Sequence, residues 1–237
     1  MTNAEQPFTA TANRLLTHLP VHQRNAIHRG SELLFCAVGD VLLRSHTYSN
    51  YVFFPVEAVV SVVRPLRDEL SIELGLIGSE GMVGLDVIMD AKTQLDHAIV
   101  QGAGSVLRMQ AGDLRKLFAS GGALQTYLLR FAHAFLGQVS QNAACNRFHP
   151  LPARISKRLL MIQDRSAMVT LYSTARILAS ALGAKEAEIE HGLEQLSATG
   201  ALRLRRDAIT INRDRLEMTS CECYETLREA YERTLSS

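Results

Sequence analysis

The first half of the chain alternates short apolar runs with turn residues. Between about residues 31 and 110 these runs read ELLFCAVGDVLL, YVFFPVEAVVSVV, LSIELGLIG and AIVQGAGSVLRM. β-branched residues dominate the runs, and glycine or proline separates them, which is typical of short antiparallel strands. The pattern predicts a compact β unit, either a barrel or a double-sheet roll.

A series of glycines follows one of these runs, in the segment GLIGSEGMVG. Its members are Gly75, Gly78, Gly81 and Gly84. Clustered glycines can let backbone N–H groups surround a phosphate, but no Lys, Arg or Thr lies between these. We therefore interpret them as turn glycines at the corners of the β unit.

From Ala123 to about Arg147 the apolar residues change to helical spacing. The main stripe consists of Leu124, Leu128, Phe131, Phe135 and Val139. A second row, Leu129, Ala132 and Leu136, lies beside it and widens the apolar surface. A long helix between two domains is a candidate dimer interface, and the main stripe is the predicted seam. The alternative is a core helix that packs only on its own β unit.

The last third of the chain has the texture of a small helical domain. Two prolines in FHPLPARI predict a break near residues 149–152. A helix in ARISKRLLMIQDR, a helix pair in STARILASALGAKEAEIEHGLEQL, two strands around an Arg206–Asp207 turn and a final helix follow. This order is the winged-helix arrangement. The predicted fold class is α+β, with domains at 1–122, 123–148 and 149–237.

The helix pair carries the features of a helix-turn-helix. Gly183 can supply a left-handed turn, and Ala179 is small where the two helices must cross closely. A shared apolar face is predicted from Leu178, Leu182, Ile189, Leu193 and Leu196.

Composition restricts the partners and the chemistry. With 25 Lys+Arg against 24 Asp+Glu, the chain has no overall excess of positive charge, so DNA binding requires a local basic surface. No apolar stretch is long enough to span a membrane, and the start lacks a basic region followed by an apolar run, so we expect a cytoplasmic protein. No catalytic triad or paired-carboxylate spacing is evident, and we expect no enzyme.

The four cysteines are too few and too scattered for a disulfide framework. Cys36 and Cys145 stand alone along the chain, and Cys221-x-Cys223 has the wrong spacing for a zinc knuckle. We therefore expect reduced thiols, no metal site and no cofactor.

Several segments together resemble the CRP/FNR family of bacterial transcription regulators. They are VGD at 38–40, SEGMVGLDVIM, QNAACNRFHPLPARISKRLLMIQDR, the helix-turn-helix and CECYETLREAYE. The resemblance covers nearly the whole chain. It implies an N-terminal double-stranded β-helix of the cyclic-nucleotide-binding type, a central dimerisation helix, and a C-terminal winged helix that binds a palindromic operator as a homodimer. RNA polymerase is a further candidate partner.

The chain departs from the family's ligand motifs. Gly84-Leu85 stands where cyclic-nucleotide binders have Gly-Glu, and Asp96-His97-Ala98 lies near the position of their phosphate-binding Arg. Without that arginine a phosphate lacks its bidentate partner, and an aspartate repels it. Iron–sulfur members have several N-terminal cysteines, whereas the first cysteine here is Cys36. The effector stays open.

The predicted recognition helix is unusually acidic. Lys185, Glu186, Ala187 and Glu188 match the family's Arg-Glu-Thr type of motif, and residues 184–195 hold one Lys against four Glu. Gly192 also costs about 1 kcal/mol relative to Ala in a helix interior. Basic residues surround this helix: Arg203, Arg205 and Arg206 on the wing, and Arg154, Lys157, Arg158 and Arg165 on the preceding helix. These could bind DNA phosphates, although Lys157 and Arg165 are interpreted as a solvated face.

Two hypotheses follow. The first is a dimeric regulator with altered base readout, whose DNA-binding residues are Lys185, Glu186, Glu188, His191, Arg203, Arg205 and Arg206. The second is a protein-interaction module or heterodimerising regulator that has lost sequence-specific DNA binding.

Overall fold

A computed structural model describes residues 13–67, 70–166, 170–171, 174–206 and 208–235 of the chain. The N-terminal part begins with two helices, α1 (Arg14–Thr17) and α2 (Val21–Arg29). Its strands are β1 (Ser31–Cys36), β2 (Val41–Leu43), β3 (Tyr51–Pro55), β4 (Val59–Pro65), β5 (Ser71–Ile77), β6 (His97–Gly102) and β7 (Gly104–Gln110). A 3-10 turn, η1 (Leu85–Val87), and helix α3 (Ala111–Ala119) complete it.

The strands form two antiparallel sheets, ordered β1-β7-β3 and β2-β6-β4-β5. Buried and partly exposed positions alternate along β6, as expected for a strand with one face on a core. Side chains such as Val52, Phe54 and Val100 are completely buried. The structure confirms the double-sheet roll among the predicted alternatives.

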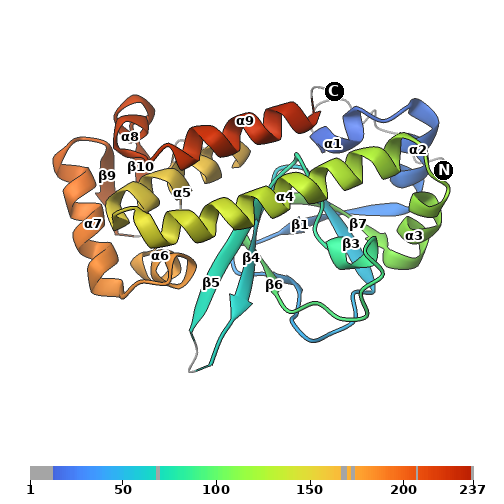
Figure 1. The fold of residues 1–237 in the computed structure, drawn as a ribbon, viewed down its shortest axis with the longest axis horizontal. Coiled ribbons are helices and arrows are strands. Elements are labelled where there is room, and N and C mark those ends of the chain that lie inside the picture. Colours follow the sequence, from blue (N-terminus) through green and yellow to red (C-terminus); the bar gives the residue numbers. More distant parts are fainter. Residues whose placement is uncertain (1–12, 68–69, 167–169, 172–173, 207, 236–237) are drawn as a thin grey trace, which may run out of the picture.

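Helix α4 (Ala123–Phe148) runs along the molecule from the β roll to the C-terminal helices (Figure 1). The C-terminal part consists of α5 (Leu151–Ser166), β8 (Thr170–Leu171), α6 (Ala175–Leu182), α7 (Glu186–Ala198), β9 (Leu202–Arg205), β10 (Ala208–Ile211), α8 (Arg213–Thr219) and α9 (Cys223–Leu235). The predicted two-stranded wing gains a third strand, because the wing sheet has the order β8-β10-β9. Helix α9 returns alongside α4 (Figure 1). In the described ranges, no helix combines the length and apolar character that crossing a membrane requires.

The prediction that the main apolar stripe of α4 forms the dimer interface is wrong, because this stripe faces the chain's own core. Leu124, Leu128 and Phe131 are 0–1% exposed and belong to the core of the chain's own β roll, and Phe135 packs against the same core. Val139 is also partly buried. The periodicity correctly showed an apolar face, but the nearby sheets already cover it. The second row instead leaves Leu129 and Leu136 exposed.

Gly78 and Gly81 flank the turn that follows β5, where Gly81 N donates to Gly78 O at 3.2 Å, whereas Gly75 lies inside β5 and is no turn glycine. Three of the four glycines also lie close to helices. A Cβ atom at Gly75 would lie 2.8 Å from the Phe135 ring, one at Gly78 would lie 2.8 Å from Arg165 Cγ, and one at Gly81 would overlap the Phe131 ring. These glycines let α4 and α5 approach the β roll closely. Only Gly84, with φ +102°, has the backbone conformation that a turn glycine provides.

The basic residues of α5 do not form a DNA-facing or solvated surface. Arg158 is 2% exposed and its Nη2 donates to Glu73 Oε2 of β5 at 2.9 Å. The Lys157 ammonium is also buried and donates to Asn142 Oδ1 at 2.7 Å. Arg154 is half-buried and donates to the carbonyl of Leu182. These cations hold α5 against neighbouring elements, so their interpretation as phosphate-binding or solvated residues is wrong.

Candidate nucleic-acid interface

The helix-turn-helix is built by the predicted local signals. Thr174 caps α6 by accepting a hydrogen bond from Ile177 N at 3.3 Å. Gly183 ends α6 in the left-handed conformation at φ +60°, and Ala184 N donates to Ala179 O at 3.1 Å. The predicted shared face is buried throughout: Leu178, Leu182, Ile189, Leu193 and Leu196.

Gly192 has a packing role that explains its presence inside α7. A Cβ atom at this position would lie 2.8 Å from Ile155 Cδ1 of α5. The glycine is buried, so α7 crosses α5 at close range there. The helix propensity lost at Gly192 is offset by a closer contact between the two helices.

The outward face of α7 carries the acidic residues. Glu186, Glu190, His191 and Glu194 are all exposed. Glu188 differs from its neighbours, because its Oε2 atom accepts a hydrogen bond from the backbone N–H of Lys185 at 2.9 Å. It therefore caps the start of α7, where a carboxylate also interacts favourably with the helix dipole.

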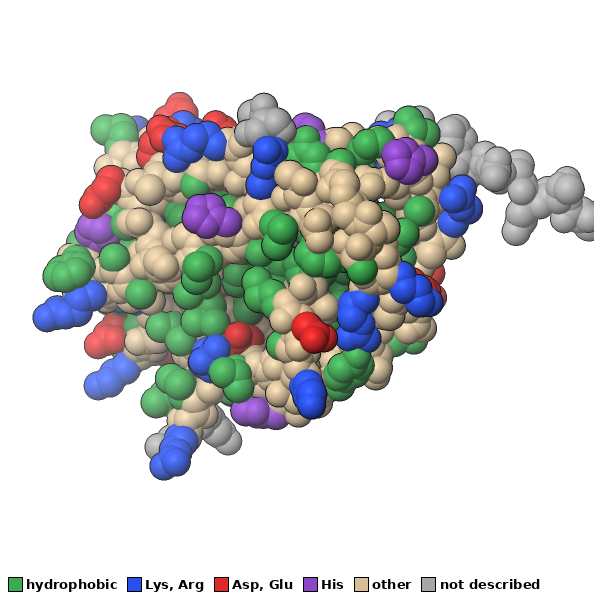
Figure 2. All heavy atoms as spheres, turned by 45° about the vertical axis from the view of Figure 1, so that its right-hand side comes forward, with side chains coloured by type: hydrophobic (Ala, Val, Ile, Leu, Met, Phe, Trp, Pro, Cys, Tyr) green, Lys and Arg blue, Asp and Glu red, His purple; other side chains and the backbone are tan. Residues whose placement is uncertain are grey.

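The arginines of the wing are exposed beside this helix. Arg203 and Arg205 lie on β9, opposite Thr210 and Ala208 of β10, and Arg206 follows at the strand end. Asp207, the other residue of the predicted turn, lies outside the described residues. Helix α7 packs against β9, so the acidic helix and the arginine-bearing strand share one end of the molecule. Figure 2 shows basic, acidic and histidine side chains standing next to one another at the left-hand end.

One Lys and three wing arginines thus face four glutamates at this end of the chain: Lys185, Arg203, Arg205 and Arg206 against Glu186, Glu188, Glu190 and Glu194. The four positive and four negative charges cancel, but they are segregated, with the arginines on the wing and the carboxylates on the helix. Such a surface can bind phosphates at the wing while the helix offers hydrogen-bond acceptors.

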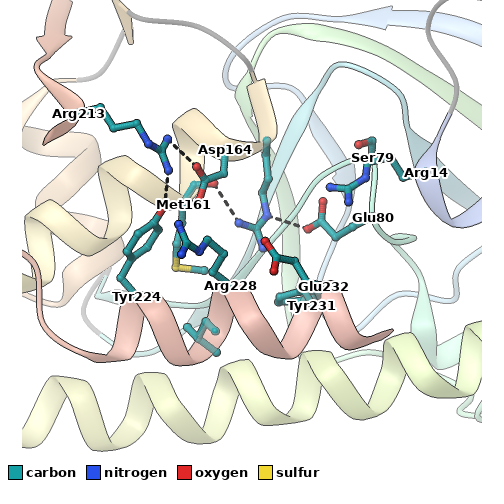
Figure 3. Close-up of a pocket in the computed structure, with 12 residues that line it drawn as sticks. Arg14, Ser79, Glu80, Met161, Asp164, Arg213, Tyr224, Arg228, Tyr231 and Glu232 are labelled. Atoms are coloured by element: carbon teal, nitrogen blue, oxygen red, sulfur yellow. Dashed lines mark hydrogen bonds and ion pairs between the residues drawn. The ribbon is translucent and has the colours of Figure 1, made fainter. Parts of the chain in front are cut away.

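A polar pocket lies between the C-terminal part and the β roll (Figure 3). On one side Arg165 Nε donates to Glu80 Oε1 at 2.7 Å, and both side chains are buried. Burial by itself lowers the pKa of Arg165, but Glu80 reverses this and the net shift is upward. On the other side Arg213 pairs with Asp164 at 2.7 Å, and Tyr224 donates to the same carboxylate at 2.9 Å. These contacts fix α5 and α9 relative to the roll.

Asp96 and His97, which lie near the family's phosphate-binding position, are each hydrogen-bonded to another residue of the β roll. Asp96 accepts from Arg64 Nε at 2.5 Å, and Ser45 N donates to His97 Nδ1 at 3.1 Å. The positive charge of Arg64 is thus paired with the Asp96 carboxylate.

Sequence reasoning missed a cluster at the end of α4. Cys145, which was expected to stand alone, lies with Cys221, Cys223 and His149, and their ligand atoms all fall within 4.8 Å of one another. The sequence did contain a partial signal, since Cys145 and His149 are four residues apart at the end of the predicted helix and Cys221 and Cys223 are two apart. The two halves come together only through the packing of α4 on the α8–α9 junction.

Comparison with known proteins identifies the fold. No protein-family model matches the chain, and no curated protein matches it either. Solved structures do. A CRP/FNR-family transcriptional regulator from Eubacterium rectale is 16% identical, with a TM-score of 0.67 over 86% of this chain and 96% of that one.

Two further structures extend the match. FixK2 from Bradyrhizobium japonicum is 17% identical, with a TM-score of 0.68 over 81% of this chain and 98% of its own. TTHA1359, a CRP/FNR-family transcriptional regulator from Thermus thermophilus, is 16% identical, with a TM-score of 0.63 over 80% of this chain and 98% of its own. The Eubacterium rectale and Thermus thermophilus proteins are both described as transcriptional regulators of the CRP/FNR family. At such identities the likeness concerns the fold: from the β roll through α4 to the winged helix, this chain has the fold of the CRP/FNR transcription regulators.

Proposed function

We propose that the protein is a DNA-binding transcription regulator that contacts its operator through α7 and the wing. The observation that carries the proposal is the exposed α7 beside three exposed wing arginines, at one end of a chain with the CRP/FNR fold. In winged-helix proteins of this kind, the second helix of the pair enters the major groove.

In the proposed complex, one set of residues contacts phosphates and supplies affinity, and another set contacts the bases. Arg203, Arg205 and Arg206, with Lys185 at the start of α7, neutralise phosphates. Glu186, Glu190 and His191 face the bases, where a glutamate can accept a hydrogen bond from cytosine N4. Because no arginine lies on the outward face of α7, guanine readout of the usual kind is lost, and the base preference is altered.

We propose further that the regulator is a homodimer that binds a two-fold symmetric site. The face of α4 that remains exposed after folding includes Leu129, His133 and Leu136, and this face replaces the buried stripe as the dimer seam. A two-fold axis along α4 would place two recognition helices on half-sites about one helical turn, roughly 34 Å, apart.

The test measures binding of the full-length protein to promoter fragments and to random DNA by fluorescence anisotropy across a series of salt concentrations. Specific retention that falls steeply with salt supports the proposal. Replacing Arg203, Arg205 and Arg206 by alanine should reduce the salt slope by about 0.9 for each phosphate that is no longer neutralised. Arg29→Ala, an exposed change on α2 at the other end of the molecule, is the control and should leave the slope unchanged.

A second candidate function rests on the four glutamates of α7, which favour a basic protein partner over DNA. The double variant Glu186→Gln with Glu190→Gln distinguishes the two candidate functions. It removes two negative charges from α7 and leaves the Glu188 cap in place. Loss of an existing sequence-specific affinity shows that these glutamates read bases. No retention above random DNA at about 50 mM salt, with strong binding appearing only in the Gln variant, supports the protein-interaction module instead.

A further inference from the structure

Four potential metal ligands meet where α4 ends. Cys145 and His149 come from the last turn and C-cap of α4, and Cys221 and Cys223 come from the junction of α8 and α9. The three cysteines are 0–8% exposed and form a small cluster of their own with Ala153 beside them. The Sγ atoms of Cys145 and Cys221 lie 3.6 Å apart, and Cys223 Sγ lies 3.5 Å from His149 Nδ1.

These separations match the edges of a tetrahedral zinc site. With Zn–S bonds of about 2.3 Å and Zn–N bonds of about 2.0–2.1 Å, tetrahedral angles place two sulfurs about 3.8 Å apart and a sulfur and a nitrogen about 3.6 Å apart. A disulfide would require its sulfurs at about 2.05 Å. We propose that the protein binds one Zn²⁺ ion through Cys145, His149, Cys221 and Cys223.

Side chains around the cluster supply the supporting contacts that such a site needs. His149 would bind the ion through Nδ1, and its Nε2 atom lies 3.1 Å from the Glu222 carboxylate, so the second ring N–H has an acceptor. Gln141 Nε2 donates to Cys223 Sγ at 3.0 Å, a bond that a thiolate accepts better than a thiol. The ligand histidine and one ligand sulfur are thereby held in orientation.

The charge around the cluster also suits a zinc–thiolate centre. Three thiolates outweigh the two charges of the ion, so the centre is an anion inside the protein. Lys157 and Arg154, both on α5, interact electrostatically with Cys145. The burial of Lys157 at 4% exposure is then explained by a buried anion next to it. On binding, each thiol gives up its proton to solvent as the metal–sulfur bond forms.

Zinc at this position would join two parts of the chain across the break at Pro150. Cys145 and Cys221 are 76 residues apart in sequence, and the ion would tie the end of α4 to the α8–α9 junction. The orientation of the winged helix relative to α4 would then depend on the metal. The inference stands independently of whether the protein binds DNA.

Metal analysis of the untagged full-length protein, purified under reducing conditions without chelator, tests the proposal. The expected result is about one zinc per chain. Replacing zinc with Co²⁺ should give the intense visible bands of a tetrahedral cobalt–thiolate centre. Neither measurement depends on a variant.

Variants then assign the ligands. Cys223→Ser should lower the zinc content at least about tenfold, as should His149→Ala, whereas Cys36→Ser, which removes a buried cysteine of β1, should leave it unchanged. Zinc-free protein that gives no cobalt–thiolate bands overturns the proposal. So does iron in place of zinc.

Discussion

At the scale of single residues, a missing side chain at Gly81 determines how closely α4 approaches the β roll. The Phe131 ring fills the space that a Cβ atom would need, and Phe131 is itself completely buried in the core. Protein interiors pack densely, so neither the ring nor the backbone can move away without cost. Gly81 therefore has a packing role in addition to its place at the end of the Gly78–Gly81 turn.

We predict that Gly81→Ala destabilises the protein by about 1–3 kcal/mol or more, because the new methyl group overpacks the core against Phe131. Chemical denaturation monitored by circular dichroism measures the change. Gly112→Ala is the matched control: Gly112 lies in α3, where an added Cβ atom would meet nothing within 4 Å, and the substitution should stabilise by up to about 1 kcal/mol. Equal effects of the two substitutions would contradict the packing argument.

At the scale of elements, buried ion pairs connect α5 to the β roll. Glu73 of β5 accepts from Arg158 Nε at 3.1 Å and Nη2 at 2.9 Å, and Ser61 donates to it at 2.6 Å. The carboxylate therefore has three donors, and the guanidinium is held in a bidentate arrangement. A buried pair of this kind is costly to break from one side, since the remaining charge stays in the interior without compensation.

We predict that Glu73→Ala lowers the free energy of unfolding by about 3–5 kcal/mol. Glu73→Leu combined with Arg158→Met should recover most of that loss, because neither charge then remains buried. Denaturation curves of the single and double variants measure the coupling. Glu32→Ala breaks the more exposed pair with Arg108, at 2.7 Å, and should change stability by no more than about 1 kcal/mol. A double variant no more stable than Glu73→Ala would argue against the ion pair as the cause.

At the scale of the whole molecule, α4 separates two apolar surfaces. Its inner face completes the core of the roll, and its outer face leaves Leu129 at 53% and Leu136 at 63% exposure. In the proposed dimer these outer residues meet their copies across a two-fold axis, so that each substitution acts on the interface twice.

We predict that Leu136→Arg shifts the protein from dimer to monomer, with a dissociation constant raised at least about 100-fold, because two like charges meet across the axis. Sedimentation equilibrium measures this shift. Met218→Arg is the control, since Met218 is an 85% exposed apolar residue on α8 away from that face. A Leu136→Arg protein that stays dimeric at micromolar concentration would place the interface elsewhere.

The strands of the roll, α4 and the helix-turn-helix could be predicted from the sequence because their signals are local, whereas α1, α2, α3 and β8 were not predicted. Short β-branched runs separated by glycine or proline predict the strands of the roll, the spacing from Leu124 to Val139 predicts α4, and Gly183 marks the turn of the helix-turn-helix. Each signal needs only neighbours within about one or two turns of chain. The altered base readout proposed for α7 stays a prediction of the same kind.

The contacts between surfaces and side chains far apart in sequence became evident from the folded structure alone. The apolar stripe of α4 could be covered by the chain's own core or by a second chain. Its helical periodicity is the same in both cases. Arg158 pairs with Glu73, which is 85 residues away in the sequence, and Cys145 contacts Cys221, which is 76 residues away. Local sequence patterns were therefore sufficient to predict the β unit, α4 and the helix pair, whereas the buried cations and the four-ligand cluster depend on contacts between distant segments.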